Sequence, residues 1–373
     1  MTLIELMVSI TIGLILLTGL AALFAQQSST QQELEKSSRQ IENGRYAIQL
    51  LQEDLQLAGY YGEFSGVSGL AVPAALPDPC AVTAADLEAA LPFAVQGYDS
   101  PSTLPTALTA CPLTTGGVLS AANYLPGTDI LVVRRVDTAV MGATLKAGEV
   151  YFQSGLEPPN RLSFAKVLQV SASTTMNTST FTLEMKDPAD TTPPPSYIAA
   201  PLRRYLVHIY FVSPCSVPAN GSTCSSTNTD DGGVSIPTLK RLELSVAGGS
   251  AKFLLEPLVE GIENMQIDYG FDASGDDGAP DSYARAPAAV GDWANVVALR
   301  LNLLARNNER SNDYQDKKVY SLGLEGAAAT TAGATTAPSG TTVTWTLTDN
   351  KFKRRVFSQL VRLVNPSARR ESP

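Results

Sequence analysis

The first 25 residues constrain the fold most strongly, because they form an apolar run long enough to cross a membrane. Residues 6–25 carry no charge and are rich in Leu, Ile and Ala. As a helix they span about 30 Å, which is the thickness of bilayer hydrocarbon. Glu5 is the one ionisable side chain through position 32. A carboxylate in hydrocarbon costs several kcal/mol unless it is paired, close to the interface or neutralised, so in a helix that is only an anchor Glu5 would be a burden.

A secretory signal peptide is the alternative interpretation of this run. Signal peptides carry basic residues before the apolar stretch and a small-residue cleavage site after it. No Lys or Arg precedes residue 6 in this chain. We therefore expect the segment to be retained as a membrane anchor.

The helix is expected to continue past the membrane. Residues 26–58 contain no Pro and consist mainly of helix formers, and Gly59 offers a C-terminal stop. An apolar stripe follows this part of the chain at Ile41, Ile48, Leu51, Leu55 and Ala58. Gly44 costs about 1 kcal/mol relative to Ala inside a helix, so it indicates a bend or a close contact. These features predict one helix of about 58 residues whose second half is amphipathic.

Beyond Gly59 the apolar residues recur with a period of two, which indicates β-strands. The strand candidates are residues 129–136, 149–153, 161–170, 180–185, 203–212, 239–247, 263–271, 295–306, 342–347 and 354–364. The predicted fold class is therefore α+β, with a pilin-like long helix packed on an antiparallel β-sheet head.

Long loops rich in small and polar residues separate the strand candidates. The clearest are 66–127, 187–201, 214–237 and 325–341, the last of which is of low complexity. We divide the chain into a membrane half of the helix (1–25), an amphipathic half (26–59) and a β-rich head (60–373).

The four cysteines fall into two sequence-local pairs, Cys80 with Cys111 and Cys215 with Cys224. No CxxC spacing occurs and the chain has one His, which leaves little material for a zinc site. An even number of cysteines beside a membrane-length helix indicates two disulfides in an oxidising compartment. We expect nearest-neighbour pairing. Four cysteines permit three connectivities, and four reduced buried thiols are the alternative.

The charge balance argues against nucleic-acid binding. The net charge is −9 and the pI is about 4.8, whereas a nucleic-acid groove normally shows a basic surplus. Residues 353–370 form the one strongly basic stretch, and their alternation indicates the polar face of a strand. We expect no nucleic-acid partner.

The residues of enzyme active sites are also sparse. His208 lies among strand formers, where a lone His is more often a packed strand residue than a catalyst. The chain has no convincing GxSxG, Walker or GxGxxG motif, so neither a catalytic triad nor a nucleotide site is indicated. We therefore expect a protein that is not an enzyme.

One loop gathers enough oxygen ligands for a hard cation. Calcium takes six to eight oxygens on a flexible turn. The candidates here are Asp272, Ser274, Asp276, Asp277 and Asp281, which are interspersed with two glycines. The spacing departs from an EF-hand, because Asp277 stands where that motif has Gly. An acidic, solvated β-hairpin is the alternative.

The opening TLIELMVSITIGLILL closely resembles the N-terminal segment of type IV pilins, in which the fifth mature residue is glutamate. QIENGRYAIQLLQEDLQLAGYYG is similar to the stem of large minor pilins of the PilW family. LVEGIENMQIDYGFD, WANVVALRLNLLAR and RRVFSQLVRLVN resemble that family's C-terminal half. The acidic loop looks like an expanded form of a loop found in many PilW relatives.

The resemblance implies specific roles for the N-terminus. Glu5 would pair with the free α-amino group of a neighbouring subunit, which relieves its desolvation and fixes the axial register. Met1 stands where pilins have their processed and N-methylated residue, commonly Phe, and no leader ending in glycine precedes it. Ala22 replaces the helix-kinking Pro of many pilins, so local melting would depend on Gly13, Thr18 and Gly19.

The function implied is that of a structural minor pilin that primes assembly of a type IV pilus and sits in its tip complex. Its partners would be other minor pilins, the major pilin and a large tip adhesin. The head would wait in the periplasm on an inner-membrane anchor and then move to the fibre tip, with roles in adhesion and twitching motility. A pseudopilin of a type II secretion system and a pilin-anchored adhesin or ligand-binding module are the alternatives.

Overall fold

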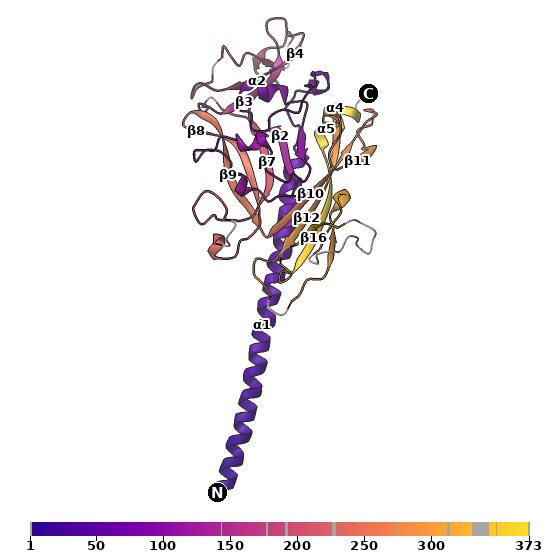
Figure 1. Ribbon diagram of the computed structural model, residues 1–373. Coiled ribbons are helices and arrows are strands. Elements are labelled where there is room, and N and C mark those ends of the chain that lie inside the picture. Colours follow the sequence, from indigo (N-terminus) through magenta and orange to yellow (C-terminus); the bar gives the residue numbers. More distant parts are fainter. Residues whose placement is uncertain are drawn as a thin grey trace.

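The computed structural model shows one long helix that enters a β-rich head (Figure 1). The N-terminal half of this helix projects from the head, and its C-terminal half runs through it between two sheets. The fold class predicted from the sequence is confirmed. The structure describes residues 2–142, 144–176, 178–190, 193–225, 229–275, 277–311, 314–329, 343–347 and 349–371.

Helix α1 spans Leu3–Gln56 without interruption, close to the predicted length. It begins at the N-cap residue Thr2 and ends two residues before Ala58, the last residue of the predicted helix. Gly59 follows with a φ of +68°, a backbone conformation that glycine adopts without strain. Its N–H donates to the carbonyl of Arg134, so the glycine turn also ties the end of the helix to the first sheet.

The first sheet has nine strands among the described residues, with the order β1-β2-β7-β3-β5-β6 along its main path. Strand β4 pairs with β3, and β8 joins β7 to β9. All these pairings are antiparallel. The strands are β1 (Val95–Tyr98), β2 (Ile130–Val136), β3 (Val150–Leu156), β4 (Phe164–Val170), β5 (Glu184–Lys186), β6 (Tyr197–Ala199), β7 (Leu202–Ser213), β8 (Thr238–Ala247) and β9 (Ser250–Glu260).

The second sheet is antiparallel and has the order β11-β10-β12-β16. Its strands are β10 (Ile262–Phe271), β11 (Ser282–Ala284), β12 (Val296–Arg306) and β16 (Arg354–Arg362). A small third sheet pairs β13 with β14 antiparallel and β14 with β15 parallel. Its strands are β13 (Val319–Ser321), β14 (Ala327–Ala329) and β15 (Val343–Thr346).

Short helices lie in the connections. Before β2 these are η1 (Gly66–Gly69), α2 (Ala84–Ala89), α3 (Thr106–Thr109) and η2 (Ala121–Asn123). After β7 they are η3 (Asp230–Gly232), α4 (Val290–Trp293), η4 (Gly323–Glu325) and the terminal α5 (Val364–Glu371).

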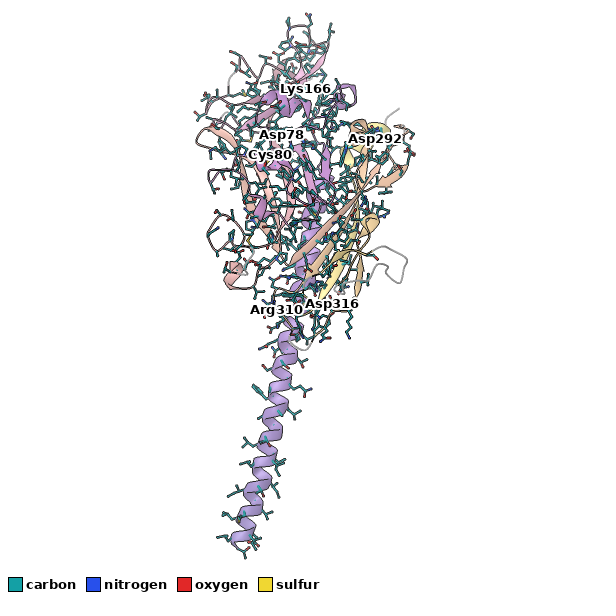
Figure 2. The ribbon with its side chains drawn as sticks, viewed as in Figure 1. Asp78, Cys80, Lys166, Asp292, Arg310 and Asp316 are labelled. Carbon is teal, nitrogen blue, oxygen red and sulfur yellow. A yellow bond between two sulfur atoms is a disulfide. The ribbon has the colours of Figure 1, made fainter. Side chains whose placement is uncertain are left out.

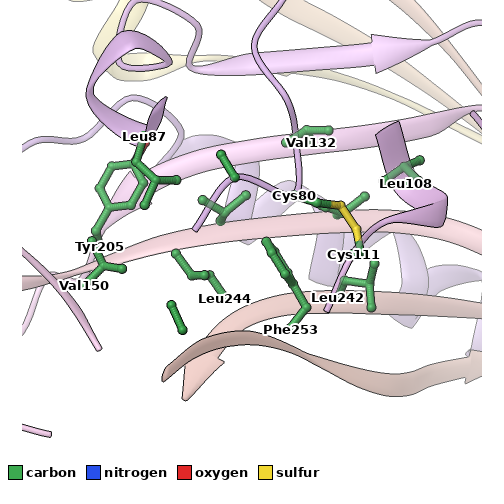
Figure 3. Close-up of a cluster of buried hydrophobic side chains, with 14 of the residues drawn as sticks. Cys80, Leu87, Leu108, Cys111, Val132, Val150, Tyr205, Leu242, Leu244 and Phe253 are labelled. Atoms are coloured by element: carbon green, nitrogen blue, oxygen red, sulfur yellow. A yellow bond between two sulfur atoms is a disulfide. The ribbon is translucent and has the colours of Figure 1, made fainter. Parts of the chain in front are cut away.

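The C-terminal half of α1 is held in one of two main cores. Ala47, Leu51, Leu55 and Ala58 pack there against apolar residues of both sheets. A second core lies between the first sheet and the 66–127 segment. Figure 3 shows part of it, with the Cys80–Cys111 disulfide among Leu108, Val132, Leu242 and Phe253.

The buried stripe of α1 differs in part from the predicted one. Leu51, Leu55 and Ala58 are buried as expected, but Ile41 and Ile48 are only half-buried. The lower part of the buried face is made instead by Gln40, Gly44 and Ala47. These residues are small or polar and give little signal in a hydrophobic pattern.

Gly44 is a close-contact glycine, and the helix continues through it. A Cβ at this position would lie 2.2 Å from the ring of Phe357 on β16. Real Cβ atoms do not approach another atom so closely, so only glycine lets the helix sit this near the second sheet. Of the two roles that the sequence allowed for Gly44, the structure shows the close contact.

Most strand predictions coincide with observed strands, and the misses have physical reasons. Segment 180–185 is strand only from Glu184, because the N–H of Leu183 donates to the side chain of Gln153 instead of to a neighbouring strand. Strand β9 was not predicted, although the pair Gly248-Gly249 before it is a typical hairpin turn.

The predicted loops also contain ordered elements. The 66–127 loop holds α2 and β1, and the 187–201 loop holds β6. In the basic stretch 353–370, β16 forms the strand that the alternation indicated, whereas helix α5 at its end was not predicted. Much of the low-complexity loop 325–341, from residue 330 onward, lies outside the described residues.

Candidate functional site

The exposed half of α1 is the strongest candidate for a functional surface. Its apolar side chains from Leu3 to Phe24 are each more than half exposed, and they contact no other part of the described chain (Figure 2). Soluble monomers rarely expose a continuous apolar surface of this extent. By length and composition α1 can cross a membrane, although a signal sequence would satisfy the same criterion. This surface is therefore suited to contact lipid or other subunits.

Glu5 has a partner within its own chain. Its carboxylate Oε2 accepts a hydrogen bond from the N–H of Thr2 at 2.8 Å, and its own N–H donates to Thr2 Oγ1 at 3.4 Å. This reciprocal pair is a capping box, which satisfies two of the free N–H groups at a helix start. The spacing of Thr2 and Glu5 carries that signal, which the sequence reasoning missed.

The capping box leaves Glu5 open to a second partner. Only Oε2 is used by Thr2, and the residue is exposed. A cation from another chain can therefore approach Oε1 without breaking the cap. The predicted role of Glu5 in subunit register stays a prediction, and Met1 lies outside the described residues.

The exposed helix has small and hydroxyl residues at intervals. A Cβ on Gly13 or on Gly19 would meet nothing within 4 Å, so neither glycine is required by packing inside this chain. Thr18 Oγ1 donates back to the carbonyls of Leu14 and Ile15 at 3.1 and 2.8 Å. Glycine and back-bonded threonine allow helices to approach one another closely in a bundle.

The base of the head contacts α1 through a cluster of polar residues. Glu33 accepts hydrogen bonds from Lys353 Nζ at 2.6 Å and from Ser311 Oγ at 2.7 Å. The Lys353 bond is the main reason why the pKa of Glu33 falls to about 2, against a smaller opposing effect of burial. Two turns further on, Gln40 Nε2 donates to the carbonyls of Ala305 and Lys353.

A buried ionic cluster fixes the upper end of α1 to the first sheet. The Asp54 carboxylate receives Arg135 Nε at 2.8 Å and Tyr210 OH at 2.9 Å, and it lies 2.8 Å from His208 Nδ1. Burial alone would raise the pKa of Asp54, but the charges and hydrogen bonds of His208 and Arg135 hold it well below its usual value. His208 is thus a packed strand residue with a structural partner.

The two disulfides join Cys80 to Cys111 and Cys215 to Cys224, which is the nearest-neighbour pairing. Among the described residues, Cys215, Cys224 and Asp230 are the one group of three potential metal ligands that lie within 4.8 Å of one another. Both sulfurs of this group are in the disulfide, so they are not available as thiolate ligands. Asp230 instead accepts the N–H groups of Ala219 and Ser225.

The described carboxylates of the acidic loop accept hydrogen bonds from the loop's own backbone. Asp272 is buried and accepts hydrogen bonds from Gly275 N–H, Gly278 N–H and Ser274 Oγ. Burial opposes ionisation of Asp272, but these hydrogen bonds lower its pKa overall.

The other acidic residues of the loop behave similarly where they are described. Asp281 accepts the N–H groups of Ala273 and Ser274, and Asp277 accepts that of Ala279. Asp276 lies outside the described residues. These bonds are typical of a turn, and a calcium site in this loop stays a prediction.

Comparison with known proteins gives one match. Residues 225–365 match the PilW family, described as type IV pilus-assembly protein W. The matched part contains β8 to β16, and therefore the whole of the sheet that packs against α1 at Gly44. No curated protein and no solved structure matches the chain.

Proposed function

We propose that this PilW-like protein is a minor pilin that primes assembly of a type IV pilus and stays in the complex at the pilus tip. The family match supports a pilus-related role in the cell envelope. The observation that carries the finer proposal is the uncovered apolar half of α1, which begins at the capped but accessible Glu5. The helix cap by itself does not require a charge at Glu5, because glutamine serves equally in a capping box.

In the assembled state, the exposed half of α1 would leave the lipid and pack among the helices of other pilins. Lipid and a helical bundle are both apolar, so the transfer costs little for the leucines and isoleucines. The transfer stabilises Glu5, because a positively charged α-amino group of a neighbour pairs with its carboxylate, which hydrocarbon cannot do. The pairing also selects one axial register between the two helices.

The bulk of the head favours a place at the tip. The head surrounds the C-terminal half of α1 with sheets on two sides. A helical shaft needs subunits that repeat closely along its axis, which a head of this size would obstruct. A terminal complex has no such restriction on its outer face. The partners proposed are therefore other minor pilins, with the major pilin below them.

Deletion of the gene tests this function. We expect surface pili to fall at least tenfold in number, counted by electron microscopy after shearing, and to return when the wild-type gene is supplied. Normal pili with lost attachment would show an adhesin instead. Intact pili with blocked release of secreted proteins would show a pseudopilin. Either result would contradict the assembly role.

A further inference from the structure

A polar pocket opens at the base of the head, where α1 leaves it. It has a volume of about 400 Å³ and is lined by Lys36, Arg310, Lys353, Tyr314 and Glu33, with Ser29 at its lower rim. Figure 2 shows Arg310 at this base, at the opposite end of the head from Lys166. Because Ser29 belongs to the projecting part of the helix, the pocket faces the apolar half of α1.

The lower rim of the pocket lies at the depth of lipid headgroups when residues 6–25 span a bilayer. Ser29 lies four residues after Ala25, or about 6 Å along the helix. Lys36 lies about 16 Å after Ala25 along the same helix. The headgroup layer extends about 5–7 Å beyond the hydrocarbon on each side. The lower rim therefore meets the headgroups, and long Lys and Arg side chains can extend toward them.

The base is basic, although the protein as a whole is acidic. Among the described residues of segments 33–39, 306–318 and 349–355, eight Lys and Arg against four Asp and Glu are exposed or half-buried, in a chain of net charge −9. Arg39, Lys317 and Lys318 are exposed there. This reversal of sign at the membrane-facing end is what an anionic lipid surface attracts.

The cations of the pocket are paired with carboxylates, and Lys36 Nζ also lies 3.6 Å from Glu309 Oε2 and donates to the carbonyl of Arg310. Lys36 and Lys353 both contact Glu33, and Arg310 Nε donates to Asp349 at 2.8 Å. The Arg310 side chain is 54% exposed, so its terminal nitrogens are open to solvent. The carboxylates of Glu33, Glu309 and Asp349 offset the three cations that line the pocket, so the positive surplus of the base comes from the exposed cations around it.

We propose that this basal pocket binds the headgroup of an anionic phospholipid while the protein waits in the membrane. Arg310 and Lys353, the more exposed cations of the pocket, would hold the phosphate, and the amphipathic ring of Tyr314 would lie at the interface, as tyrosines do at membrane surfaces. The proposal rests on the membrane-anchored state of the proposed function and adds a specific lipid ligand to it. The bound lipid would hold the head upright on the bilayer until assembly.

The melting temperature of the full-length protein in nonionic detergent tests the proposal. Mixed micelles with phosphatidylglycerol should raise it by about 3 °C, because a ligand that binds the folded state stabilises it. Phosphatidylcholine should leave it unchanged. The shift should shrink in 0.5 M NaCl, where the Debye length is only about 4 Å.

Two double variants make the test specific. Arg310→Gln with Lys353→Gln should abolish the shift, whereas Arg310→Lys with Lys353→Arg should retain it. Lys146→Gln with Lys186→Gln removes the same charge from exposed sites far along the chain and should also retain it. An equal shift with phosphatidylcholine, or a shift that survives in the first variant, would overturn the proposal.

Inorganic phosphate distinguishes a lipid from a free anion. If 10 mM phosphate gives the whole shift by itself, the pocket binds phosphate and not a headgroup, and the lipid proposal fails. These measurements use purified protein, so their outcome is independent of whether deletion removes pili.

Discussion

Glu5→Ala is expected to remove the protein from assembled pili while leaving it in the membrane. Without the carboxylate the apolar run begins earlier, so insertion is unchanged or improved. The helix then offers no counter-charge to a neighbour's α-amino group, and the register of docking is no longer selected. We expect at least a tenfold loss from sheared pili, measured by immunoblot against the amount in the membrane fraction.

Two variants separate the charge of Glu5 from its helix cap. Glu5→Gln keeps an oxygen that can accept the Thr2 N–H but removes the charge, because glutamine serves equally in a capping box. Thr2→Ala removes the threonine half of the cap and leaves the charge. We expect the Glu5→Gln protein to be lost from pili and the Thr2→Ala protein to be retained in them. Normal recruitment of Glu5→Gln would rule out the ion pair.

Asp54→Ala is expected to be the most damaging single change to the fold of the head. It would leave Arg135, Tyr210 and His208 without the buried carboxylate that all three contact. Breaking a buried ion pair by removing one partner typically costs about 3–5 kcal/mol. Urea unfolding followed by circular dichroism should show a loss of this size in the free energy of unfolding. The neighbouring, exposed Glu53→Ala is the control and should change it by less than about 0.5 kcal/mol.

The same cluster gives the head a defined response to acid. The pKa of Asp54 is lowered on folding. Its ionised carboxylate therefore contributes fully to the free energy of unfolding when the pH is above the ordinary pKa of 3.8. As the pH falls below that value, the unfolded state takes up a proton that the folded state resists, and stability is lost. The wild-type melting temperature should therefore drop below pH 4 more steeply than that of Asp54→Asn. Parallel curves for the two proteins would contradict this assignment.

The sequence predicted the elements whose periodicity extends over many residues. The run 6–25 and the alternation of β12 depend on burial that repeats along one face, and such patterns are visible without the fold. The buried stripe of α1 was less predictable at Gln40 and Gly44. Gln40 is buried because its amide donates to the carbonyls of Ala305 on β12 and of Lys353 just before β16, and these carbonyls come together only once the strands are in place.

The same limit applies to the polar sites. Asp54 and His208 are 154 residues apart in sequence, and neither carries a local signal of the other. The acidic loop carries a strong local signal, but its carboxylates accept N–H groups that a sequence pattern does not show. The basal pocket joins three distant segments, so the basic surplus around it appears only in the folded head.

The central claim is that the exposed half of α1 contacts other pilins in the fibre. A photo-crosslinking amino acid at Leu17, which is 69% exposed on this helix, tests it directly in cells. The same amino acid at Val140, which is 57% exposed on the head, is the control for random collisions. Sheared pili should contain Leu17 adducts with other pilins and few Val140 adducts. Pili that contain the protein but show no Leu17 adducts with any pilin would contradict the account.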